Sequence, residues 1–267
     1  MIPGVRTIAF VKATACGNDF LLIDTSQVPA PDRGEVTRKI CDRRHGVGAD
    51  GVEWMLPHSS ADIEVNLINA DGSGAEISGN GTRCVAAYLF SEQGKEKITI
   101  QTGAGLKTCM LTSRNDWEYE FEMAMGTAEV NKKLVFKTQS VETCGIPVST
   151  GNPHYVIFVE QFPNQWQSLA AEVQRSSHFP YGVNVEFVRV EGKHDLRALF
   201  FERGAGETQS SGTGSCASAA AAISTGRAES PVNVHAPGGT QTVRREGTDS
   251  YLRGPARLLC RGEFFLT

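Results

Sequence analysis

The sequence predicts an α/β protein built from two similar halves, and three observations lead to this prediction. Short strand-like runs alternate with helix-like segments along the chain. Gly-Asn turns and glycine-rich turns recur in the same order in both halves, at one separation of about half the chain. The length of 267 residues is enough for two domains of about 130 residues each.

The internal repeat has three landmarks. "CGNDFLLID" is echoed by "TGNPHYVIF", "GVGADG" by "YGVNVE", and "LINADGSGAEISGNG" by "LFFERGAGETQSSGTG". The paired residues are Asn18 with Asn152, Asp50 with Asn184, and Ser78 with Ser211. Three motifs that keep one order and one spacing favour duplication over a chance recurrence of glycine and serine. We therefore expect a pseudo-symmetric pair of domains, residues 1–125 and 126–267, whose C-terminal strand is free to return to the first half.

Each half follows one plan. A strand, a turn and a second strand are followed by a helix, and Gly46 is expected to end the first of these helices. Strands then lead through a glycine-rich turn into an apolar helix that we expect to be buried in the middle of its half. Further β-runs complete the half. The expected segments are 7–13, 20–24, 34–46, 63–69, 82–90, 97–103 and 118–124, then 155–159, 168–177, 196–202, 215–224, 232–236, 240–245 and 263–267.

Composition and charge exclude several classes of protein. The net charge of −4 disfavours nucleic-acid binding, which requires a basic face. The chain has no window of 18 apolar residues and no export-signal pattern, so we expect a cytoplasmic protein that does not bind membranes. The seven cysteines form no C-x-x-C pair and the six histidines lack ligand spacing. Free thiols and no metal site are the expectation.

The chemistry is expected where the glycine-rich turns meet the buried helices. A helix N-terminus carries unpaired N–H groups and a partial positive charge, so it binds anions, and glycines let a ligand approach the backbone. Neither turn has the G-K-[ST] of a P-loop, and Cys84 stands where a dinucleotide motif has its third glycine. We expect the two turns to face one another across an interdomain cleft. Ser78 and Ser211 would then flank one carbon, as stereoinversion by two proton carriers requires.

Seven motifs carry a family resemblance that spans nearly the whole chain. They are "GNDF" (17–20), "NADGS" (69–73), "GNGTRC" (79–84), "GNPH" (151–154), "VNVEF" (183–187), "ERGAGET" (202–208) and "GTGSC" (212–216). In these motifs the chain resembles the diaminopimelate epimerases, which invert one α-carbon of diaminopimelate without pyridoxal phosphate. The resemblance implies two α/β domains, each a mostly antiparallel sheet or barrel around a central helix. It also implies a small amino-acid substrate, no cofactor and a place in lysine and peptidoglycan precursor synthesis, and it leaves a homodimer possible.

The resemblance assigns expected roles to residues. The clamp for the distal, unreacting end of the substrate comprises Asn69, Asn152, Asn184 and Arg203. The backbone cradle for the carboxylate at the reacting centre comprises Gly79, Asn80, Gly212 and Thr213. Asn18 and Glu202 are further substrate contacts, and His154 and Glu202 assist the two proton carriers. An Asn in a Gly-Asn turn is often only a turn residue, and His154 could be a buried structural histidine.

The chain departs from the family at the proton carriers. The family has cysteine at both positions, and this chain has Ser78 and Ser211. A thiol has a pKa near 8.5 that a helix N-terminus lowers further, whereas an alcohol ionises far less easily. General acid–base steps contribute roughly 10²–10⁴-fold, so the exchange is expected to reduce activity severely. Cys84 and Cys216, several residues into the helices, are interpreted as packing residues.

Four interpretations remain open from the sequence. The chain is a natural relative that uses a different base, an epimerase whose two cysteines were replaced, a non-catalytic binder of amino acids, or a lyase or dehydratase. Two smaller departures accompany the serines. Gly51 stands where many members carry a substrate-facing glutamine, and Cys260 lies near a position where some carry a tyrosine at a dimer interface.

Overall fold

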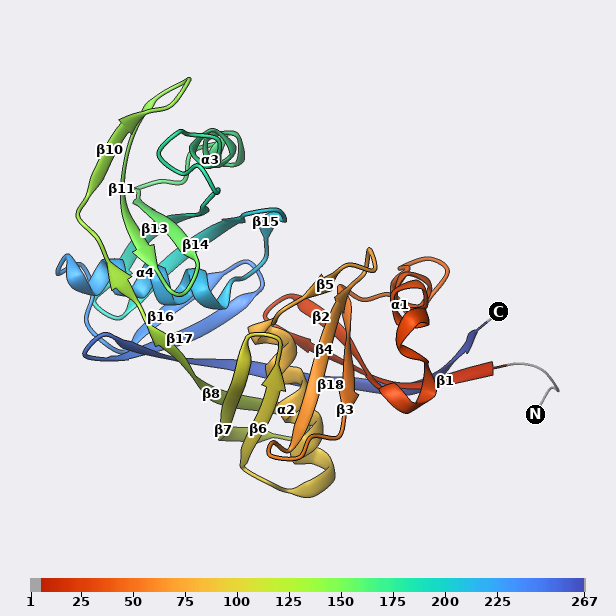
Figure 1. Cartoon of the computed structure of the whole chain (residues 1–267). Coiled ribbons are helices and arrows are strands. Elements are labelled where there is room, and N and C mark those ends of the chain that lie inside the picture. Colours follow the sequence, from red (N-terminus) through yellow and green to blue (C-terminus); the bar gives the residue numbers. More distant parts are fainter. Residues whose placement is uncertain (1–5, 267) are drawn as a thin grey trace. The chain divides into compact units, whose positions relative to one another are not determined.

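The structure is a computed structural model that describes residues 6–266. The chain forms two compact units (Figure 1). Unit 1 contains the chain up to Met123 together with the segment from Gly254 onwards, and unit 2 runs from Ala124 to Arg253. Both boundaries lie inside strands, β8 (Glu118–Thr127) and β18 (Asp249–Leu266), so the chain passes between the units twice. The last strand thus belongs mostly to unit 1.

In unit 1 the strands form a sheet that closes on itself. Its members are β1 (Arg6–Ala15), β2 (Asn18–Asp24), β3 (Gly51–Leu56), β4 (Ile63–Asn69), β6 (Lys97–Thr102) and β7 (Gly105–Asn115), with parts of β8 and β18. Each strand pairs with the next in this order, and β18 returns to pair antiparallel with β1. The short β5 (Gly74–Ala75) adds to β4.

Unit 2 repeats this arrangement. Its strands are β9 (Glu129–Val130), β10 (Leu134–Lys137), β11 (Glu142–Ser149), β12 (Pro153–Phe158), β13 (Asn184–Gly192), β14 (Asp195–Glu202), β15 (Gly206–Thr208), β16 (Val232–Ala236) and β17 (Gly239–Glu246). The parallel pairs β12–β13 and β14–β16 correspond to β2–β3 and β4–β6 of unit 1. The antiparallel pairs β13–β14 and β16–β17 likewise correspond to β3–β4 and β6–β7, as an internal duplication requires.

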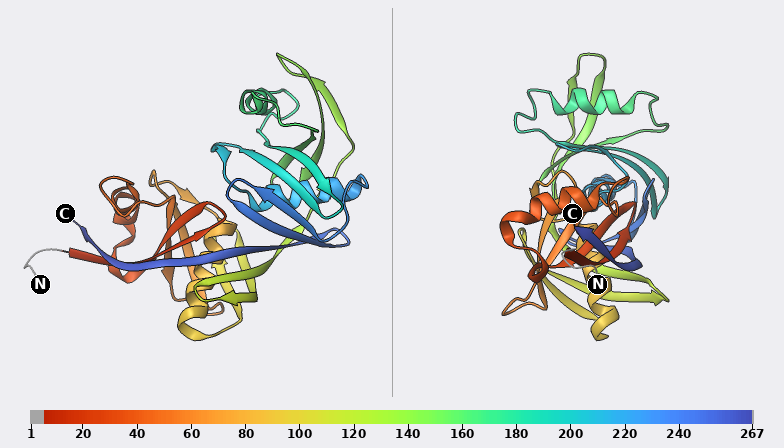
Figure 2. Two further views of the ribbon diagram at one scale, coloured as in Figure 1. Left: turned by 180° about the vertical axis from the view of Figure 1, so that it is seen from behind. Right: turned by 90° about the vertical axis from the view of Figure 1, so that its right-hand side faces the viewer.

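One buried helix lies in the middle of each unit. These helices are α2 (Gly79–Gln93) and α4 (Gly212–Ser224). Every residue of α4 from Gly214 to Ala222 is buried, and its alanines pack in the main apolar cluster of unit 2. The right-hand view of Figure 2 looks along α4, which lies inside the strands of its own unit. The predicted fold, two similar halves that each enclose a small-residue-rich helix, is confirmed.

The outer helices are shorter than predicted or shifted. The predicted helix 34–46 is α1 (Arg33–Cys41), because Asp42 leaves the helical region with ψ 124° and its carboxylate accepts the amides of the next turn. Gly46 therefore does not end the helix. It packs against the end of α1, where a Cβ would lie 2.4 Å from the Lys39 carbonyl. The predicted helix 168–177 is α3 (Trp166–Gln174).

The strands next to the central helices were the main omission of the sequence analysis. It did not predict β3 or β13, and it treated Asp50 as the counterpart of Asn184. The strand registers correct this alignment: Phe20 lies opposite Gly51, and His154 lies opposite Asn184. Gly51 is thus the counterpart of Asn184. The predicted strand 263–267 is the end of β18, and residue 267 lies outside the described range.

Among the described helices, none has the length and apolar character needed to cross a bilayer.

Candidate active site

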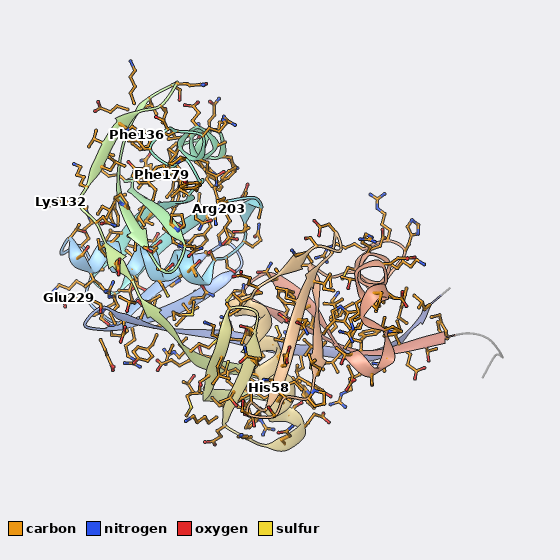
Figure 3. All side chains as sticks on the ribbon, viewed as in Figure 1. His58, Lys132, Phe136, Phe179, Arg203 and Glu229 are labelled. Atoms are coloured by element: carbon orange, nitrogen blue, oxygen red, sulfur yellow. The ribbon has the colours of Figure 1, made fainter. Side chains whose placement is uncertain are left out.

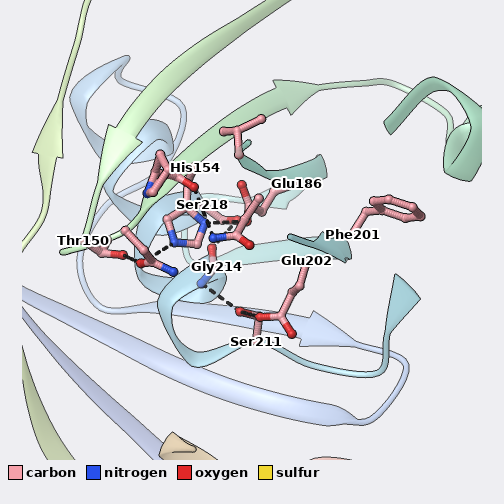
Figure 4. A network of polar contacts seen from close by, with 12 residues as sticks. Thr150, His154, Glu186, Phe201, Glu202, Ser211, Gly214 and Ser218 are labelled. Atoms are coloured by element: carbon pink, nitrogen blue, oxygen red, sulfur yellow. Dashed lines mark hydrogen bonds and ion pairs between the residues drawn. The ribbon is translucent and has the colours of Figure 1, made fainter. Parts of the chain in front are cut away.

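Ser211 is the N-cap residue of α4 and makes two hydrogen bonds (Figure 4). Its Oγ accepts a hydrogen bond from the Gly214 amide at 3.1 Å and donates one to Glu202 Oε1 at 2.7 Å. Ser211 is buried, with 4% of its surface exposed. The single hydroxyl proton of Ser211 therefore points at a carboxylate oxygen, so the hydroxyl and the base predicted from the sequence are in direct contact.

Ser78 caps α2 in the same way. Its backbone is extended, with φ −121° and ψ 120°, and its Oγ accepts a hydrogen bond from the Gly81 amide at 3.1 Å. Serine is among the favoured N-cap residues because its short side chain reaches the third amide of the helix. The sequence predicts both serines as proton carriers, and the structure shows that each is also the N-cap of its helix. The S-x-x-G spacing ahead of each apolar helix was the signal that could have revealed it.

The first amides of α2 and α4 belong to the predicted carboxylate cradle, Gly79 and Asn80 in one unit and Gly212 and Thr213 in the other. Amides at this position have no intrahelical acceptor and lie at the positive end of the helix dipole. A Cβ placed on Gly79 would meet no described atom within 4 Å. A ligand can therefore approach the backbone at the start of α2.

A partly buried chain of polar groups lies beside the first turn of α4 (Figure 4). Thr150 donates to Asn152 Oδ1 at 2.9 Å, and His154 Nε2 lies 3.0 Å from the same oxygen. Because that oxygen only accepts hydrogen bonds, Nε2 is the nitrogen that carries hydrogen. His154 Nδ1 lies 2.6 Å from Glu186 Oε1, and both side chains are almost fully buried. The pair thus shares a proton, either on the imidazole or on the carboxyl.

Asn184 and Arg203 form a second polar group in unit 2. Asn184 donates to the Pro153 carbonyl at 3.1 Å and accepts the Arg203 amide at 2.8 Å. The guanidinium of Arg203, labelled in Figure 3, is exposed and donates to the Tyr181 carbonyl at 2.8 Å. Its aliphatic part lies over Gly182, where a Cβ would be 2.7 Å from Arg203 Cδ. Asn184 thus holds the backbone of Arg203, and the guanidinium remains at the surface.

In unit 1, two of the predicted residues bond to each other. Asn80 donates to Asn18 Oδ1 at 2.8 Å, and Asn18 donates in turn to Asp50 Oδ2 at 3.0 Å. Asn80 also accepts a hydrogen bond from Arg83, a fully buried side chain. The start of α2 is therefore fastened to the turn between β1 and β2. Both amides have structural partners here, and a ligand role for Asn18 stays a prediction.

The predicted site residues fall into two groups, one in each unit. Unit 1 holds Asn18, Asn69, Ser78, Gly79 and Asn80, and unit 2 holds Asn152, His154, Asn184, Glu202, Arg203, Ser211, Gly212 and Thr213. Asn69 ends β4 opposite Gly51, and its amide donates to Ser73 Oγ at 3.1 Å. Direct hydrogen bonds join Ser211 with Glu202, Asn152 with His154, and Asn18 with Asn80.

Sequence reasoning missed two buried carboxyls, Glu53 on β3 and Glu186 on β13. Each is 1% exposed and lies against the third residue of the central helix in its unit. Burial raises the pKa of Glu53 to about 8. Burial also raises the pKa of Glu186, although the neighbouring His154 opposes that shift. An acid inside the apolar runs "GVEWML" and "NVEFV" was the available signal.

The cysteines near the turns are not available for proton transfer. Cys84 and Cys216 are completely buried, and desolvation raises the pKa of both thiols, that of Cys216 to about 12. Both side chains are buried packing residues, as predicted. All seven cysteines are free thiols. Within residues 6–266, no group of three or more histidine, cysteine or acidic side chains is arranged to hold a metal ion.

Comparison with known proteins places the chain in a family. The family model described as diaminopimelate epimerase matches residues 10–131 and 146–259. The diaminopimelate epimerase of Desulfitobacterium hafniense is 36% identical over 273 residues, covering 94% of this chain and 96% of that protein. The diaminopimelate epimerase of Methanothrix thermoacetophila is 36% identical over 272 residues, with coverages of 97% and 96%.

Solved structures agree with the observed fold. A phenazine biosynthesis protein of the PhzF family from Bacillus anthracis superimposes with a TM-score of 0.74 at 17% identity, covering 96% of this chain and 98% of that one. A hydroxyproline epimerase from Agrobacterium vitis, solved with bound trans-4-hydroxy-L-proline, gives a TM-score of 0.72 at 17% identity, with coverages of 98% and 93%. At this identity they support the fold alone. The sequence matches decide the family: the chain belongs to the diaminopimelate epimerases.

Proposed function

We propose that the protein inverts the α-carbon of a diaminopimelate-like amino acid by transferring protons through serine hydroxyls, converting the LL form to the meso form without a cofactor. The observation that carries this proposal is the 2.7 Å hydrogen bond from Ser211 to Glu202 at the N-terminus of α4. A serine alone is a poor base, because an alcohol ionises far less readily than the thiol of the relatives. A carboxylate that already accepts the serine proton compensates for part of this difference.

The proposed proton transfer is concerted. Ser211 Oγ takes the α-proton of the substrate while its own proton passes to Glu202 Oε1. The C–H bond breaks, a new O–H bond forms on Ser211, and the old one is replaced by an O–H bond on Glu202. The negative charge that develops next to the substrate carboxylate lies at the N-terminus of α4, where amides and the helix dipole stabilise it. Ser78, the counterpart of Ser211, is the second proposed proton carrier.

The substrate preference is proposed from the second polar group of unit 2. Arg203 offers an exposed planar guanidinium that matches a carboxylate with two parallel hydrogen bonds. Asn152 and Asn184 of the same unit supply amide groups suited to an amino acid head, and His154 lies at the Asn152 oxygen. A role for Asn69, which lies in unit 1, stays a prediction. A second amino acid end on the substrate satisfies these groups, which favours a diamino dicarboxylic acid over a simple amino acid.

Binding can be tested by isothermal titration. We expect meso- and LL-diaminopimelate to bind, and lysine, which lacks the second carboxylate, to bind more weakly. Arg203→Lys should weaken diacid binding more than tenfold while the circular dichroism spectrum stays unchanged. Equal failure of all diacids, or an unchanged affinity of the variant, would contradict the proposed substrate.

Chemistry can be tested separately by following loss of the α-proton in heavy water. Glu202→Gln keeps the size of the side chain but cannot take the proton of Ser211. We expect it to slow exchange by roughly 10²-fold or more, since this is the range of a general acid–base contribution. Glu207→Gln, an exposed neighbour in β15, is the matched control and should exchange like the parent. Diacid binding without exchange would favour a binding protein, and release of ammonia or water would favour a lyase.

A further inference from the structure

Glu53 is a buried carboxyl that the proposed proton transfer does not yet use. It lies in the middle of β3, between Val52 and the fully buried Trp54. Its Oε1 is buried and has no hydrogen-bond partner in the described part of the chain. Leaving a polar group in this state costs about 1–3 kcal/mol, and more if the group is charged. A leucine would fill this position without that cost, so the carboxyl calls for an explanation.

The carboxyl of Glu53 lies directly against the turn that Ser78 caps. A Cβ built on Gly81 would be 1.9 Å from Glu53 Oε1 and 3.3 Å from Ser78 Cβ. Glu53 Oε1 and the Ser78 side chain thus share the same side of the first turn of α2. The Gly81 amide donates to Ser78 Oγ, which keeps the hydroxyl at this place. The Glu53 carboxyl therefore lies beside the turn that Ser78 caps. Among the described residues no hydrogen bond joins Glu53 to Ser78, whereas Ser211 donates directly to Glu202.

The duplication offers a direct comparison. Glu186 is the counterpart of Glu53, since Glu186 lies opposite Val156 and Glu53 lies opposite Leu22 in the matching strand pairs. Glu186 has a partner, His154. In unit 1, Phe20 takes the place of His154, so the carboxyl has no basic group at the equivalent position. Arg83, the nearest cation along α2, is turned to Asn80 and to the Pro255 carbonyl.

We propose that Glu53 is the proton-holding carboxyl of the half-site in unit 1, and that it supplies a proton through Ser78 to the α-carbon of the substrate. When the intermediate is protonated, Ser78 gives its hydroxyl proton to the α-carbon and takes the proton of Glu53. The new C–H bond replaces the O–H bond of Ser78, and Glu53 becomes a carboxylate at the positive end of α2. In the reverse reaction Glu53 is the acceptor. The inference rests on the proposed epimerase function and completes it.

The two half-sites then begin the reaction in different states. Ser211 donates to Glu202, so this carboxyl is arranged as an acceptor. Burial without a cation holds the proton on Glu53 at neutral pH. A carboxyl that accepts a serine proton and a carboxyl that burial keeps protonated are suited to the roles of base and acid. Two serines with identical surroundings would not provide this separation into a base and an acid.

The test is stereochemically resolved proton exchange in heavy water, with LL- and DD-diaminopimelate as substrates. Glu53→Gln should lower exchange from one configuration by roughly 10²-fold or more, the size of a general acid–base step. With a substrate of the other configuration, Glu53→Gln should still exchange the α-proton with retention of configuration, but it should no longer invert the α-carbon. Glu202→Gln should show the opposite pattern, and the surface variant Glu191→Gln should match the parent. A purely structural role for Glu53 predicts an equal loss for both configurations, which would overturn the proposal.

Two further variants keep the test decisive. Ser211→Cys leaves Ser78 and Glu53 intact and provides a faster background if the parent exchanges slowly. Adding Ser78→Cys to Glu53→Gln should restore the rate of α-proton exchange to within about tenfold of the rate measured with Glu53 intact. The reason is that a thiol needs little help from a carboxyl. No rescue would mean that Glu53 does not act through Ser78.

A spectroscopic measurement separates this inference from the epimerase function itself. Infrared difference spectra of the parent should contain the carbonyl band of a protonated carboxyl at pH 7, and Glu53→Gln should lack it. Ser78→Ala should change the pH at which the band titrates. If no form exchanges protons but the band responds in this way, the epimerase function fails while the Glu53–Ser78 contact stands. Absence of a band that depends on Glu53 would contradict the inference whatever the activity.

Discussion

At the scale of single residues, the two serines cap the central helices, and the proposed mechanism gives them a chemical role as well. Each caps a buried helix through its Oγ, and Ser211 also donates to Glu202. A serine cap contributes about 0.5–2 kcal/mol relative to alanine. The sequence could suggest that these positions carry protons, because the duplicated turns point to them. It could not reveal the buried carboxyls that lie against the first turns of the two helices, because β3 and β13 bring Glu53 and Glu186 there from distant parts of the chain.

The titration of Glu53 predicts how stability depends on pH. Burial raises its pKa in the folded protein from 4.5 to about 8, so the folded state holds more protons than the unfolded state between these values. The free energy of unfolding should therefore fall as pH rises from about 4.5 to about 8, by at most about 1.4 kcal/mol per pH unit from this group. Glu53→Gln removes this contribution, so the variant should gain stability relative to the parent as pH rises.

Urea unfolding at several pH values measures this effect. Glu191 is the matched control because it lies on β13 at the surface, where Arg197 and Arg189 lower its pKa to about 2. Its contribution to stability changes only in acid, so Glu191→Gln should leave the slope between pH 5 and 8 as in the parent. If Glu53→Gln and the parent show the same slope of unfolding free energy against pH, Glu53 is not buried as a neutral acid.

At the scale of elements, the first turn of α2 is the place where packing and chemistry meet. Gly81 has no room for a side chain, since a Cβ would lie 1.9 Å from Glu53 Oε1, whereas a Cβ on Gly79 would meet no described atom within 4 Å. Gly81→Ala must displace the carboxyl, and overpacking of this kind costs about 1–3 kcal/mol. Gly79→Ala should be nearly neutral for folding.

Denaturant unfolding of the two variants and of Gly81→Ala combined with Glu53→Ala checks this. Shortening Glu53 removes the clash, so the penalty of Gly81→Ala should largely disappear in the double variant, a non-additivity expected for residues in contact. Equal stability of the Gly81 and Gly79 variants would contradict the described packing of β3 on α2.

The elements also show what patterns in the sequence can predict. The central helices were predictable because long runs of small apolar residues between strands have few alternatives to burial. The strand β3 was not, because "GVEWML" is short and an acid interrupts its apolar run. The end of α1 at Cys41 depends on the side chain of Asp42, which captures two amides of the following turn. Local capping of this kind overrides the helical period.

At the scale of the whole molecule, duplication is the property that the sequence predicted best. Two units repeat the same parallel and antiparallel pairings around one helix each. The repeat also shows where the halves diverge: His154 in unit 2 corresponds to Phe20 in unit 1. The return of β18 to unit 1 could not be fixed from local patterns, because it depends on pairing with β1 at the other end of the chain.

The most direct test of this account replaces both serines by the cysteines that the family resemblance implies. In heavy water, the parent should exchange the α-proton of LL-diaminopimelate slowly and form some meso product that carries deuterium. The variant with Ser78→Cys and Ser211→Cys should do so much faster, because a thiol near a helix N-terminus is the better proton carrier. NMR follows the exchange, and chiral chromatography follows the inversion. A parent as fast as the double-cysteine form, or a double-cysteine form that binds the diacid without exchanging its proton, would contradict the account.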